Sequence, residues 1–567
     1  MRSVLFIAIL FATILQPSDA APGHFARTSQ AEQGSGCPSI GNNFNKTLPN
    51  LNNATLQELN AGLSHGQFTS VQLVEAYLAR IQEVNPILKA VTEINPDALT
   101  IAKGLDEERK HGLARSPLHG IPILLKNNIA TLDSMNNTAG SYALLGTHVS
   151  SDSTVAARLR QAGVILLGKA NMNEWAAARG NGNPDGWSAY GGQCTGAYRV
   201  LQDPAGSSSG SAVAVSIGLA FAALGTDTSG SIVLPAGQNN VVGIRPTSGL
   251  TSRAGVIPFS LRQDSVGPLA QTVWDAASIL DIIVGADRLD NYTLANPNPA
   301  IRYTTGLNQT PEGILKNARI GIPANVIATA TLPEFNVLNS TQPILDSFEL
   351  AAQLLGKAGA AIVANSTYSA WFQFLNESDA TQNVAASDFR ANLGSYLSRL
   401  PGPAPRSLEE ITNFTQSNPL EEYPSHSTST FELALDVPAN DGIEIWTQYQ
   451  RNLFLSNEGG PVGALDRDNL DAIILPSVFA PILSDLGGLP IVSVPLGFYP
   501  IDQPVWDVLN ITRAAPGIPY GLSFIGRKWS EKKLIELAYA FEQLSGVRKQ
   551  GVPVIFPQTV LGDIVGK

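Results

Sequence analysis

Apolar residues recur at helical spacing in the first predicted element of the chain. Thr69 and Gln72 have the spacing of a capping box, in which each side chain bonds the other residue's backbone amide. The apolar stripe that follows this box consists of Val74, Tyr77, Leu78, Ile81 and Val84. The pattern predicts a helix from Thr69 that ends at Asn85–Pro86, because a proline disfavours the helical conformation of the residue before it.

Short apolar runs between helical segments predict strands. Leu88–Ile94 contains charged residues and is expected to be half-buried, whereas Ile121–Leu125 and Val164–Gly168 have the composition of fully buried strands. Helices are expected around the charged residues 107–110 and over Ser153–Ala162. This alternation of strands and helices predicts an α/β fold with a mixed sheet.

The later chain adds two strands, Ile491–Leu496 and Tyr520–Ile525, and a final helix capped by Ser530. Residues 287–317 and 401–441 have weak apolar patterns and are expected to be insertions that line or cover the entrance of a substrate site. No internal repeat is evident. The predicted organisation is an irregular arm over 21–50, one large domain over 51–545 and a tail over 546–567.

Composition and charge narrow the classes of function. The chain has 567 residues, of which 44% are apolar and 15% are charged, so it can bury a large core. Its net charge of −11 and isoelectric point of about 5.1 argue against a nucleic-acid partner.

The first 20 residues have the features of a secretory signal. Arg2 precedes the apolar run Val4–Leu15, and small residues lead to a cleavage site after Ala20. The run is too short to span a membrane, so we expect a secreted protein without a membrane span. Ten glycosylation sequons agree with this route, at Asn45, Asn53, Asn136, Asn291, Asn308, Asn339, Asn365, Asn376, Asn413 and Asn510.

The two cysteines, Cys37 and Cys194, are too few for a disulfide scaffold or a zinc site. In an oxidising compartment they can form one disulfide, which would tie the N-terminal arm to the region before residue 206. Two separate thiols are the alternative. The sequence does not decide between these readings and assigns no oligomeric state.

Two glycine- and serine-rich turns, 206–211 and 226–231, flank the small apolar run Ala212–Leu224, which predicts a tightly packed helix. Glycines in such turns let the backbone approach a ligand and point its N–H groups at it. A single turn of this kind is typical of a packing corner. Two such turns, each with a serine in a fixed glycine setting, favour an active site.

These turns resemble those of the amidase signature family. Ser207 and Ser231 occupy the positions of the two catalytic serines, and Lys126, at the end of the run His119–Asn128, matches the catalytic lysine. The resemblance extends from about Leu51 to Gln543. It implies a single large domain with a central mixed sheet covered by helices on both faces, and a cis peptide before Ser207.

Three further segments resemble the peptide-amidase-like branch of this family: residues 169–175, 186–193 and 521–527. Many other family members carry an arginine where this chain has Val233, and valine at this position also fits the branch. The resemblance therefore implies hydrolysis of a linear amide, from a small-molecule or a peptide substrate. It implies no cofactor and no metal.

Roles follow from what amide hydrolysis requires: a nucleophile, a proton carrier and an oxyanion site. Ser231 would form the acyl-enzyme, and Ser207 would carry protons to and from Lys126, which must be neutral to act. The expected oxyanion donors are the backbone amides of Thr228, Ser229, Gly230 and Ser231. Supporting roles are expected for Ser208 and Asp227.

Two other readings remain open at this stage. The spacing Gly206-x-Ser208-x-Gly210 matches the nucleophile elbow of α/β-hydrolases, with His426 as the one histidine that follows it. The chain can also be a non-catalytic amidase-like binding protein. The sequence assigns no substrate-binding residue, so peptide, aryl and fatty acyl amides all remain possible substrates.

Overall fold

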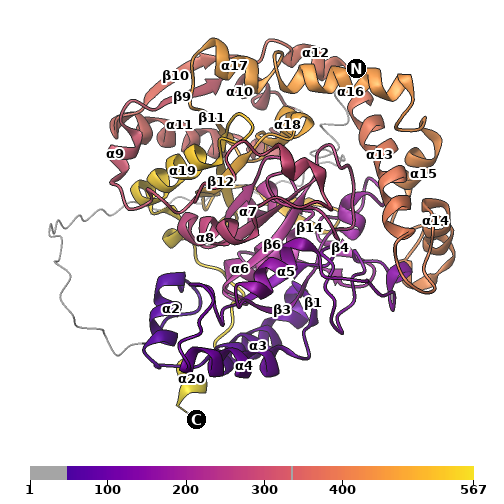
Figure 1. The fold of residues 1–567 in the computed structure, drawn as a ribbon. Helices are drawn as coiled ribbons and strands as arrows, with labels where there is room; N and C mark the ends of the chain where they lie inside the picture. Colours follow the sequence, from indigo (N-terminus) through magenta and orange to yellow (C-terminus); the bar gives the residue numbers. More distant parts are fainter. Residues whose placement is uncertain (1–47, 334–335, 378, 567) are drawn as a thin grey trace.

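A mixed sheet of eleven strands runs through the molecule, in the order β1-β3-β2-β6-β8-β7-β12-β15-β11-β9-β10 (Figure 1). The computed structural model describes residues 48–333, 336–377 and 379–566. The strands of this sheet are β1 (Val91–Ile94), β2 (Pro122–Lys126), β3 (Ile165–Ala170), β6 (Ala222–Asp227), β7 (Val242–Arg245), β8 (Ser265–Ala270), β9 (Arg319–Pro323), β10 (Ala361–Ser366), β11 (Ala472–Pro476), β12 (Ile491–Phe498) and β15 (Pro519–Ile525). Two small hairpins lie outside it, β4 (Trp187–Ser188) with β5 (Gly192–Gln193), and β13 (Trp506–Val508) with β14 (Ile511–Ala514).

The sheet contains two groups of parallel strands, and antiparallel pairs separate these groups. β3, β2 and β6 are parallel neighbours, and β11, β9 and β10 form a second parallel group. The strands between these groups pair antiparallel. β2, β3 and β6 are buried along their whole length, as their continuous apolar runs predict for strands covered on both faces.

Helices cover both faces of the sheet. α5 (Thr154–Gln161) joins β2 to β3, and α6 (Ser209–Ser216) joins β3 to β6. Because β2 lies between β3 and β6, these connections run in opposite directions along the sheet, and right-handed crossovers then place their helices on opposite faces. α7 (Val233–Gln238) packs on α6, whereas α8 (Val273–Ile283) packs on α5 and α19 (Glu531–Ser545) on α8.

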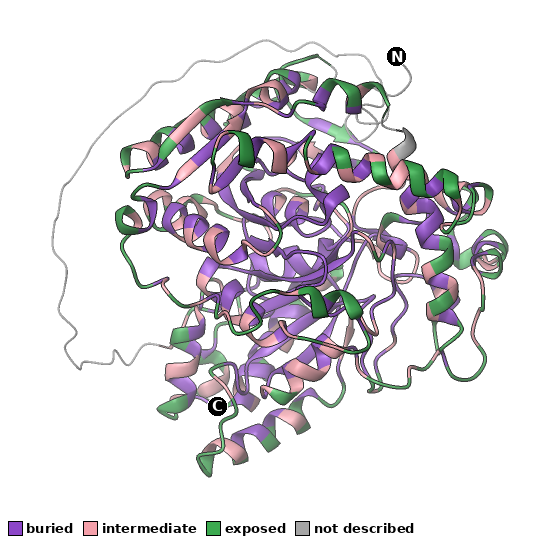
Figure 2. Ribbon diagram, turned by 45° about the horizontal axis from the view of Figure 1, so that its top comes forward, coloured by how far each residue is buried: buried purple, intermediate pink, exposed green. Residues whose placement is uncertain are grey.

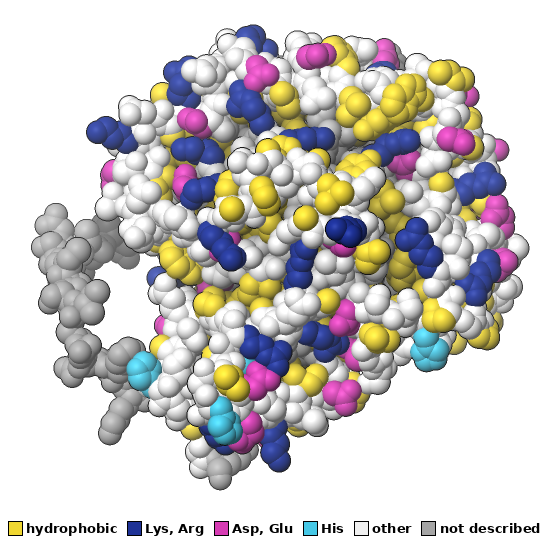
Figure 3. Space-filling view, viewed as in Figure 1, with side chains coloured by type: hydrophobic (Ala, Val, Ile, Leu, Met, Phe, Trp, Pro, Cys, Tyr) yellow, Lys and Arg dark blue, Asp and Glu magenta, His cyan; other side chains and the backbone are white. Residues whose placement is uncertain are grey.

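The remaining helices surround this framework, and Figure 2 shows many of the exposed residues on these outer helices. They are α2 (Leu56–Ser64), α3 (Ser70–Leu88), α4 (Ala98–Lys110), α9 (Pro311–Leu315), α10 (Ala324–Ala330), α11 (Gln342–Lys357), α12 (Trp371–Asn376), α13 (Asp379–Leu397), α14 (Leu408–Ser417), α15 (Ser429–Asp436), α16 (Ile443–Ser456), α17 (Pro461–Arg467), α18 (Pro481–Ser484) and α20 (Gly562–Val565). On the face in Figure 3, acidic and basic side chains are interspersed with polar ones. Within the described ranges, none of these helices is long and apolar enough to cross a membrane.

Two predicted element boundaries are wrong. The predicted helix over Ala212–Leu224 is instead α6 followed by β6, because Gly218 adopts a left-handed φ of 65° after α6 and the chain then pairs with β2 and β8. α3 does begin with the predicted capping box, but it continues through Pro86 to Leu88. The side chain of Asn85 bonds both backbone groups of Val91, which fixes the exit of the helix three residues later than predicted.

The weakly patterned segment 401–441 contains helices instead of a long loop. α14 and α15 pack with α13 around a separate apolar cluster that includes Phe389, Leu408, Ile411 and Phe431. Each helix is short, so its apolar stripe holds only a few residues and is hard to recognise in the sequence. Residues 287–317 are mostly irregular, as predicted, apart from α9 and one 3-10 turn.

Two further predictions concern single side chains. Ser530 occupies the N-cap position of α19, but its hydroxyl bonds the carbonyl of Arg527 and caps no helical amide. Cys194 is buried and has no disulfide partner among the described residues, and Cys37 lies outside them. The Cys37–Cys194 disulfide therefore stays a prediction.

Candidate active site

The last residue of β2, Lys126, is completely buried. Its Nζ lies 2.7 Å from Ser207 Oγ, 3.0 Å from Ser208 Oγ and 3.1 Å from the carbonyl oxygen of Thr226. Burial lowers its pKa to about 7, although the carboxylates of Asp227 and Asp264 oppose this shift. A neutral lysine amine has two N–H donors and one lone pair, so one of the two serine hydroxyls can donate to it.

The first turn holds Ser207 and Ser208 in the interior at the start of α6. The Gly206–Ser207 peptide is cis, as the family resemblance implies. Asn173 donates its backbone N–H to the carbonyl of Ser207 at 3.2 Å. Ser208 stands at the N-cap position of α6, and its hydroxyl also bonds the carbonyl of Thr226. Both hydroxyls therefore lie within hydrogen-bonding distance of the buried amine of Lys126.

The second turn follows β6, the neighbour of β2 in the sheet, and carries Ser231. The backbone N–H of Ser208 donates to the carbonyl of Ser231 at 3.1 Å, which joins the two turns directly. Ser231 keeps 8% of its surface exposed. The fold thus brings Lys126, Ser207 and Ser231, which lie 81 and 24 residues apart in sequence, into one small region.

The four expected oxyanion donors are not equivalent. The amide of Gly230 donates to Asp227 Oδ1 at 2.9 Å, so it is already engaged. In the described part of the chain, the amides of Thr228, Ser229 and Ser231 have no hydrogen-bond acceptor. The side chain of Thr228 is held by Asp264 at 2.6 Å. Three backbone donors around the second turn are therefore free for an oxyanion.

The carboxylate of Asp227 holds the second turn by accepting backbone hydrogen bonds from it. Besides Gly230, it accepts the amide of Ile232 at 2.6 Å and the guanidinium of Arg245 at 3.1 Å. Arg245 also lies 2.9 Å from Asp485, and all three charged side chains are buried. Burial raises the pKa of Asp485; Arg245 opposes this shift and the charge of Asp227 adds to it. Sequence reasoning proposed Asp227 but missed its partners, although Arg245 is the one charged residue in an apolar strand.

His426 does not contact Ser208. Its ring stacks on Trp187 with centroids 3.5 Å apart, and its Nδ1 faces Glu422 at 3.3 Å. The hydroxyl of Ser208 instead bonds Lys126 Nζ and the backbone carbonyl of Thr226. Moreover, β3 ends well before the first turn, so no strand leads directly into Ser208. The arrangement lacks the serine–histidine contact that a nucleophile elbow requires.

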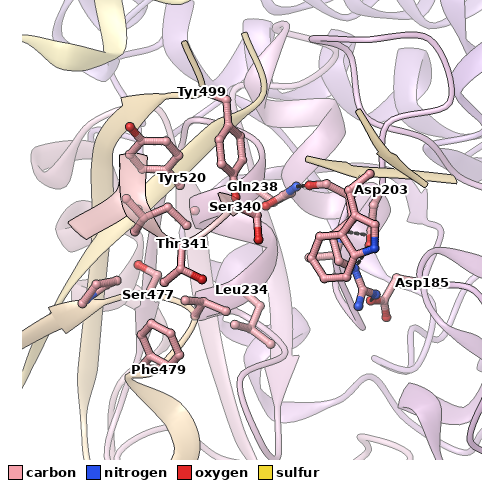
Figure 4. Close-up of a pocket in the computed structure, with 18 residues that line it drawn as sticks. Asp185, Asp203, Leu234, Gln238, Ser340, Thr341, Ser477, Phe479, Tyr499 and Tyr520 are labelled. Atoms are coloured by element: carbon pink, nitrogen blue, oxygen red, sulfur yellow. Dashed lines mark hydrogen bonds and ion pairs between the residues drawn. The ribbon is translucent and has the colours of Figure 1, made fainter. Parts of the chain in front are cut away.

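A cavity of about 100 Å³ lies beside the two turns. Ala205, which precedes the cis peptide, and Leu234, in the first turn of α7, form part of its wall. Aromatic side chains and the carboxylates of Asp185 and Asp203 are among the other lining residues, as Figure 4 shows. The cavity thus adjoins both turns, through Ala205 and Leu234, while Lys126, Ser207 and Ser231 are not among its lining residues.

Comparison with known proteins identifies the family of this chain. The sequence model of the Amidase family matches residues 72–535. The chain belongs to the amidase family. A protein of Arthroderma benhamiae whose name gives amidase as its proposed activity is 46% identical over 542 residues, which cover 91% of this chain and 90% of that protein.

Solved amidase structures share the fold. Peptide amidase from Stenotrophomonas maltophilia aligns with a TM-score of 0.77 and 36% identity, over 88% of this chain and 98% of that one. An amidase family protein from Bacillus anthracis aligns with a TM-score of 0.76 and 30% identity, over 88% and 92% of the two chains. Like other members of the amidase family, the protein is an amidohydrolase that acts on amides.

Proposed function

We propose that this amidase works through a Ser–Ser–Lys triad in which Ser231 forms the acyl-enzyme. The observation that carries the proposal is the position of Lys126, an amine with a lowered pKa that lies within hydrogen-bonding distance of Ser207. A buried amine with no carboxylate among its direct hydrogen-bond partners is suited to exchange protons near neutral pH. The bond between the backbones of Ser208 and Ser231 adds support, because it keeps the relay beside the nucleophile.

In the proposed first step, Ser231 Oγ attacks the amide carbonyl carbon. Its proton passes to Ser207 as the proton of Ser207 passes to Lys126 Nζ. The free amides of Thr228, Ser229 and Ser231 bind the oxyanion that forms. The proton then returns from Lys126 through Ser207 to the nitrogen of the substrate, the C–N bond breaks and the amine leaves. Water hydrolyses the ester by the same relay and releases a carboxylic acid.

Labelling with a fluorophosphonate, followed by mapping of the modified peptide, tests the nucleophile. We expect label on Ser231, and none in Ser231→Ala. Ser207→Ala should retain slow labelling, since the attacking oxygen remains. Because a catalytic triad acts as a unit, Ser231→Ala combined with Lys126→Ala should hydrolyse amides hardly more slowly than Ser231→Ala alone. Label on Ser208 that disappears in His426→Ala would overturn the proposal.

We also infer that the protein is secreted and glycosylated. The signal-like residues 1–20 support this inference but lie outside the described residues, as does the sequon at Asn45. Eight of the nine sequon asparagines in the described ranges are exposed: Asn53, Asn291, Asn308, Asn339, Asn365, Asn376, Asn413 and Asn510. The ninth, Asn136, is half-buried, and its amide bonds Glu93 at 3.0 Å.

A further inference from the structure

The cavity beside the turns has a predominantly apolar wall. Phe479, Tyr499, Trp506 and Tyr520 contribute aromatic rings to it, and the rings of Tyr499 and Tyr520 meet edge to face at 5.2 Å between centroids. In Figure 4, the rings of Phe479, Tyr499 and Tyr520 lie on one side of the view, and Asp185 and Asp203 lie on the other. One cavity therefore combines aromatic faces with carboxylates.

At the charged end, Asp203 is fully engaged. Its Oδ2 accepts the guanidinium of Arg513 at 2.9 Å, and its Oδ1 accepts the amide of Ala205 at 2.8 Å. The side chain of Asp203 is only 4% exposed. The ring of Trp506 lies against the same guanidinium, with its centroid 5.7 Å from Arg513 Cζ. Asp203 and Arg513 thus form a largely buried ion pair.

Asp185 is a second carboxylate at this end of the cavity, and one guanidinium cannot neutralise both carboxylates. Its Oδ2 is 3.6 Å from Arg513, too far for a direct hydrogen bond, and its Oδ1 accepts the amide of Asn173 at 2.7 Å. Its side chain is 32% exposed, and the charged groups that face it are Asp203 and Arg513. Two carboxylates share one guanidinium, so this end of the cavity has a net negative charge when both are ionised.

Asn173 connects this charge to the first turn. The same side chain that donates to Asp185 lies against Gly206, where an added Cβ would meet the side-chain oxygen of Asn173 at 2.3 Å. The backbone N–H of Asn173 donates to Ser207. Asp185 is therefore one side chain away from the turn that carries the proposed relay.

We propose that this cavity selects amides whose short aliphatic part carries a protonated amine, with Asp185 as the counter-charge. The proposal rests on the proposed function, because it assigns a substrate class to the cavity that adjoins the proposed triad. A cation supplies the positive charge that the two carboxylates lack. Asp185 acts here as a specificity-determining residue.

The volume limits the chain that carries the cation. The cavity measures about 100 Å³, less than the ~150 Å³ of an apolar protein cavity that binds benzene. It accommodates an aminoalkyl group of a few carbons. Burial and the neighbouring charge of Asp203 raise the pKa of Asp185 to about 6, so the counter-charge is present above that pH.

Direct binding tests the cation site without catalysis. Calorimetry on the full secreted chain would compare n-butylammonium with 1-butanol, its neutral counterpart of similar size. We expect the ammonium ion to bind at least tenfold more tightly, and Asp185→Asn to remove this difference. Asp436→Asn is the matched control, since it removes the same charge from an exposed position on α15 outside the cavity. Equal binding of the two compounds to the wild type would overturn the proposal.

Kinetics on paired amides test the same residue in turnover. The cationic series is glycinamide, β-alaninamide and 4-aminobutanamide, and each has a partner in which methyl replaces the ammonium group. For at least one chain length, kcat/KM should favour the cation at least tenfold between pH 6 and 7, where Asp185 is ionised and the substrate amine is still protonated. Lowering the pH below 6 should reduce this preference. Asp185→Asn should lower the ratio of kcat/KM for the cationic amide to kcat/KM for its methyl partner at least tenfold. Asp436→Asn should leave this ratio unchanged.

The outcomes separate the two proposals. A ratio near one at every chain length, or a ratio that Asp185→Asn leaves unchanged, contradicts the cation site. Selective ammonium binding by a protein whose Ser231 takes no fluorophosphonate label supports the cation site and contradicts the proposed triad. Label on Ser231 together with equal binding of butanol and butylammonium keeps the triad and removes the substrate class.

Discussion

At the residue scale, the environment of Lys126 decides what this side chain can do. A lysine in water titrates near pH 10.5, whereas burial lowers the pKa of Lys126 to about 7. The unfolded chain therefore binds more protons than the folded chain between these two pH values. Holding this amine in the interior costs folding free energy at and below neutral pH, and the cost disappears as pH rises toward 10.5. Such a cost is typical of functional groups.

The pH dependence of hydrolysis should follow Lys126. Only the neutral amine accepts a proton, so kcat/KM for a neutral amide should rise about tenfold per pH unit below pH 7 and level off above it. Lys126→Arg should lower kcat/KM by at least ~10³-fold at every pH, because a guanidinium stays protonated. His426→Ala should leave the rise in place. A rise that disappears with His426 would contradict the assignment of Lys126.

At the element scale, α6 positions the first turn by packing closely on the end of β3. A Cβ added at Gly210 would lie 2.2 Å from the carbonyl oxygen of Ala90 and 2.5 Å from the amide of Asn171. The amide of Gly210 also donates to the carbonyl of Asn171. These contacts are with backbone atoms, which side-chain rearrangement cannot relieve. The glycine therefore lets the turn that carries Ser207 and Ser208 approach Lys126.

Gly210→Ala should displace this turn. We expect a loss of stability of at least ~1–3 kcal/mol, as for other overpacked sites, and a fall in kcat larger than the stability loss explains. Gly104→Ala is the control, since nothing lies within 4 Å of its added Cβ on the exposed face of α4. Alanine there should stabilise by ~0.5–1 kcal/mol. Urea unfolding and amide hydrolysis measure both effects; normal activity in Gly210→Ala would contradict this role.

The second turn depends on β7 in a similar way, because β7 ends with Arg245. Arg245→Met would leave Asp227 and Asp485 buried without their cation. Removing one partner of such a buried group costs ~3–5 kcal/mol, so the unfolding midpoint in urea should fall markedly. The exposed Arg288→Met should change stability by less than ~0.5 kcal/mol. Equal midpoints for the two variants would show that Arg245 contributes no special stability.

At the scale of the whole molecule, the order of strands assembles the site. β2 and β6 are neighbours, so the residues that end these strands, Lys126 and Asp227, come to the same edge of the sheet. The helices α13–α15 form their own apolar cluster beside this framework. The exposed sequons lie in segments far apart along the chain, so the whole fold determines which asparagines a glycan can reach.

Glycosylation should follow exposure. In protein secreted from a eukaryotic host, we expect the mature chain to begin at Ala21 and peptide mapping to find glycans at several of the eight exposed asparagines. Asn136 should stay unmodified, because its amide already bonds Glu93. Peptide-N-glycosidase treatment with mass spectrometry measures the occupancy. An intracellular protein, or one that keeps residues 1–20, would contradict the inference of secretion.

The sequence by itself determined the elements with strong local signals. The buried strands β2 and β3, the capped start of α3 and the helix α5 follow from continuous apolar runs and helical spacing, which are local properties. The two serine turns stood out by composition, and Lys126 was identified through the family resemblance that these motifs carry. Local patterns also sufficed for the fold class, because strands alternating with helices favour an α/β sheet.

Tertiary structure decided the rest, because the relevant contacts join distant residues. β6 takes its strand form from pairing with β2 and β8, which overrides the helical composition of Ala212–Leu224. Asp485 reaches Arg245 from 240 positions away, and Arg513 reaches Asp185 from 328. Charge balance, burial and the resulting pKa values depend on such neighbours. No local pattern contains them, so only the folded chain shows that the pKa of Lys126 is lowered and that Asp185 and Asp203 share one guanidinium.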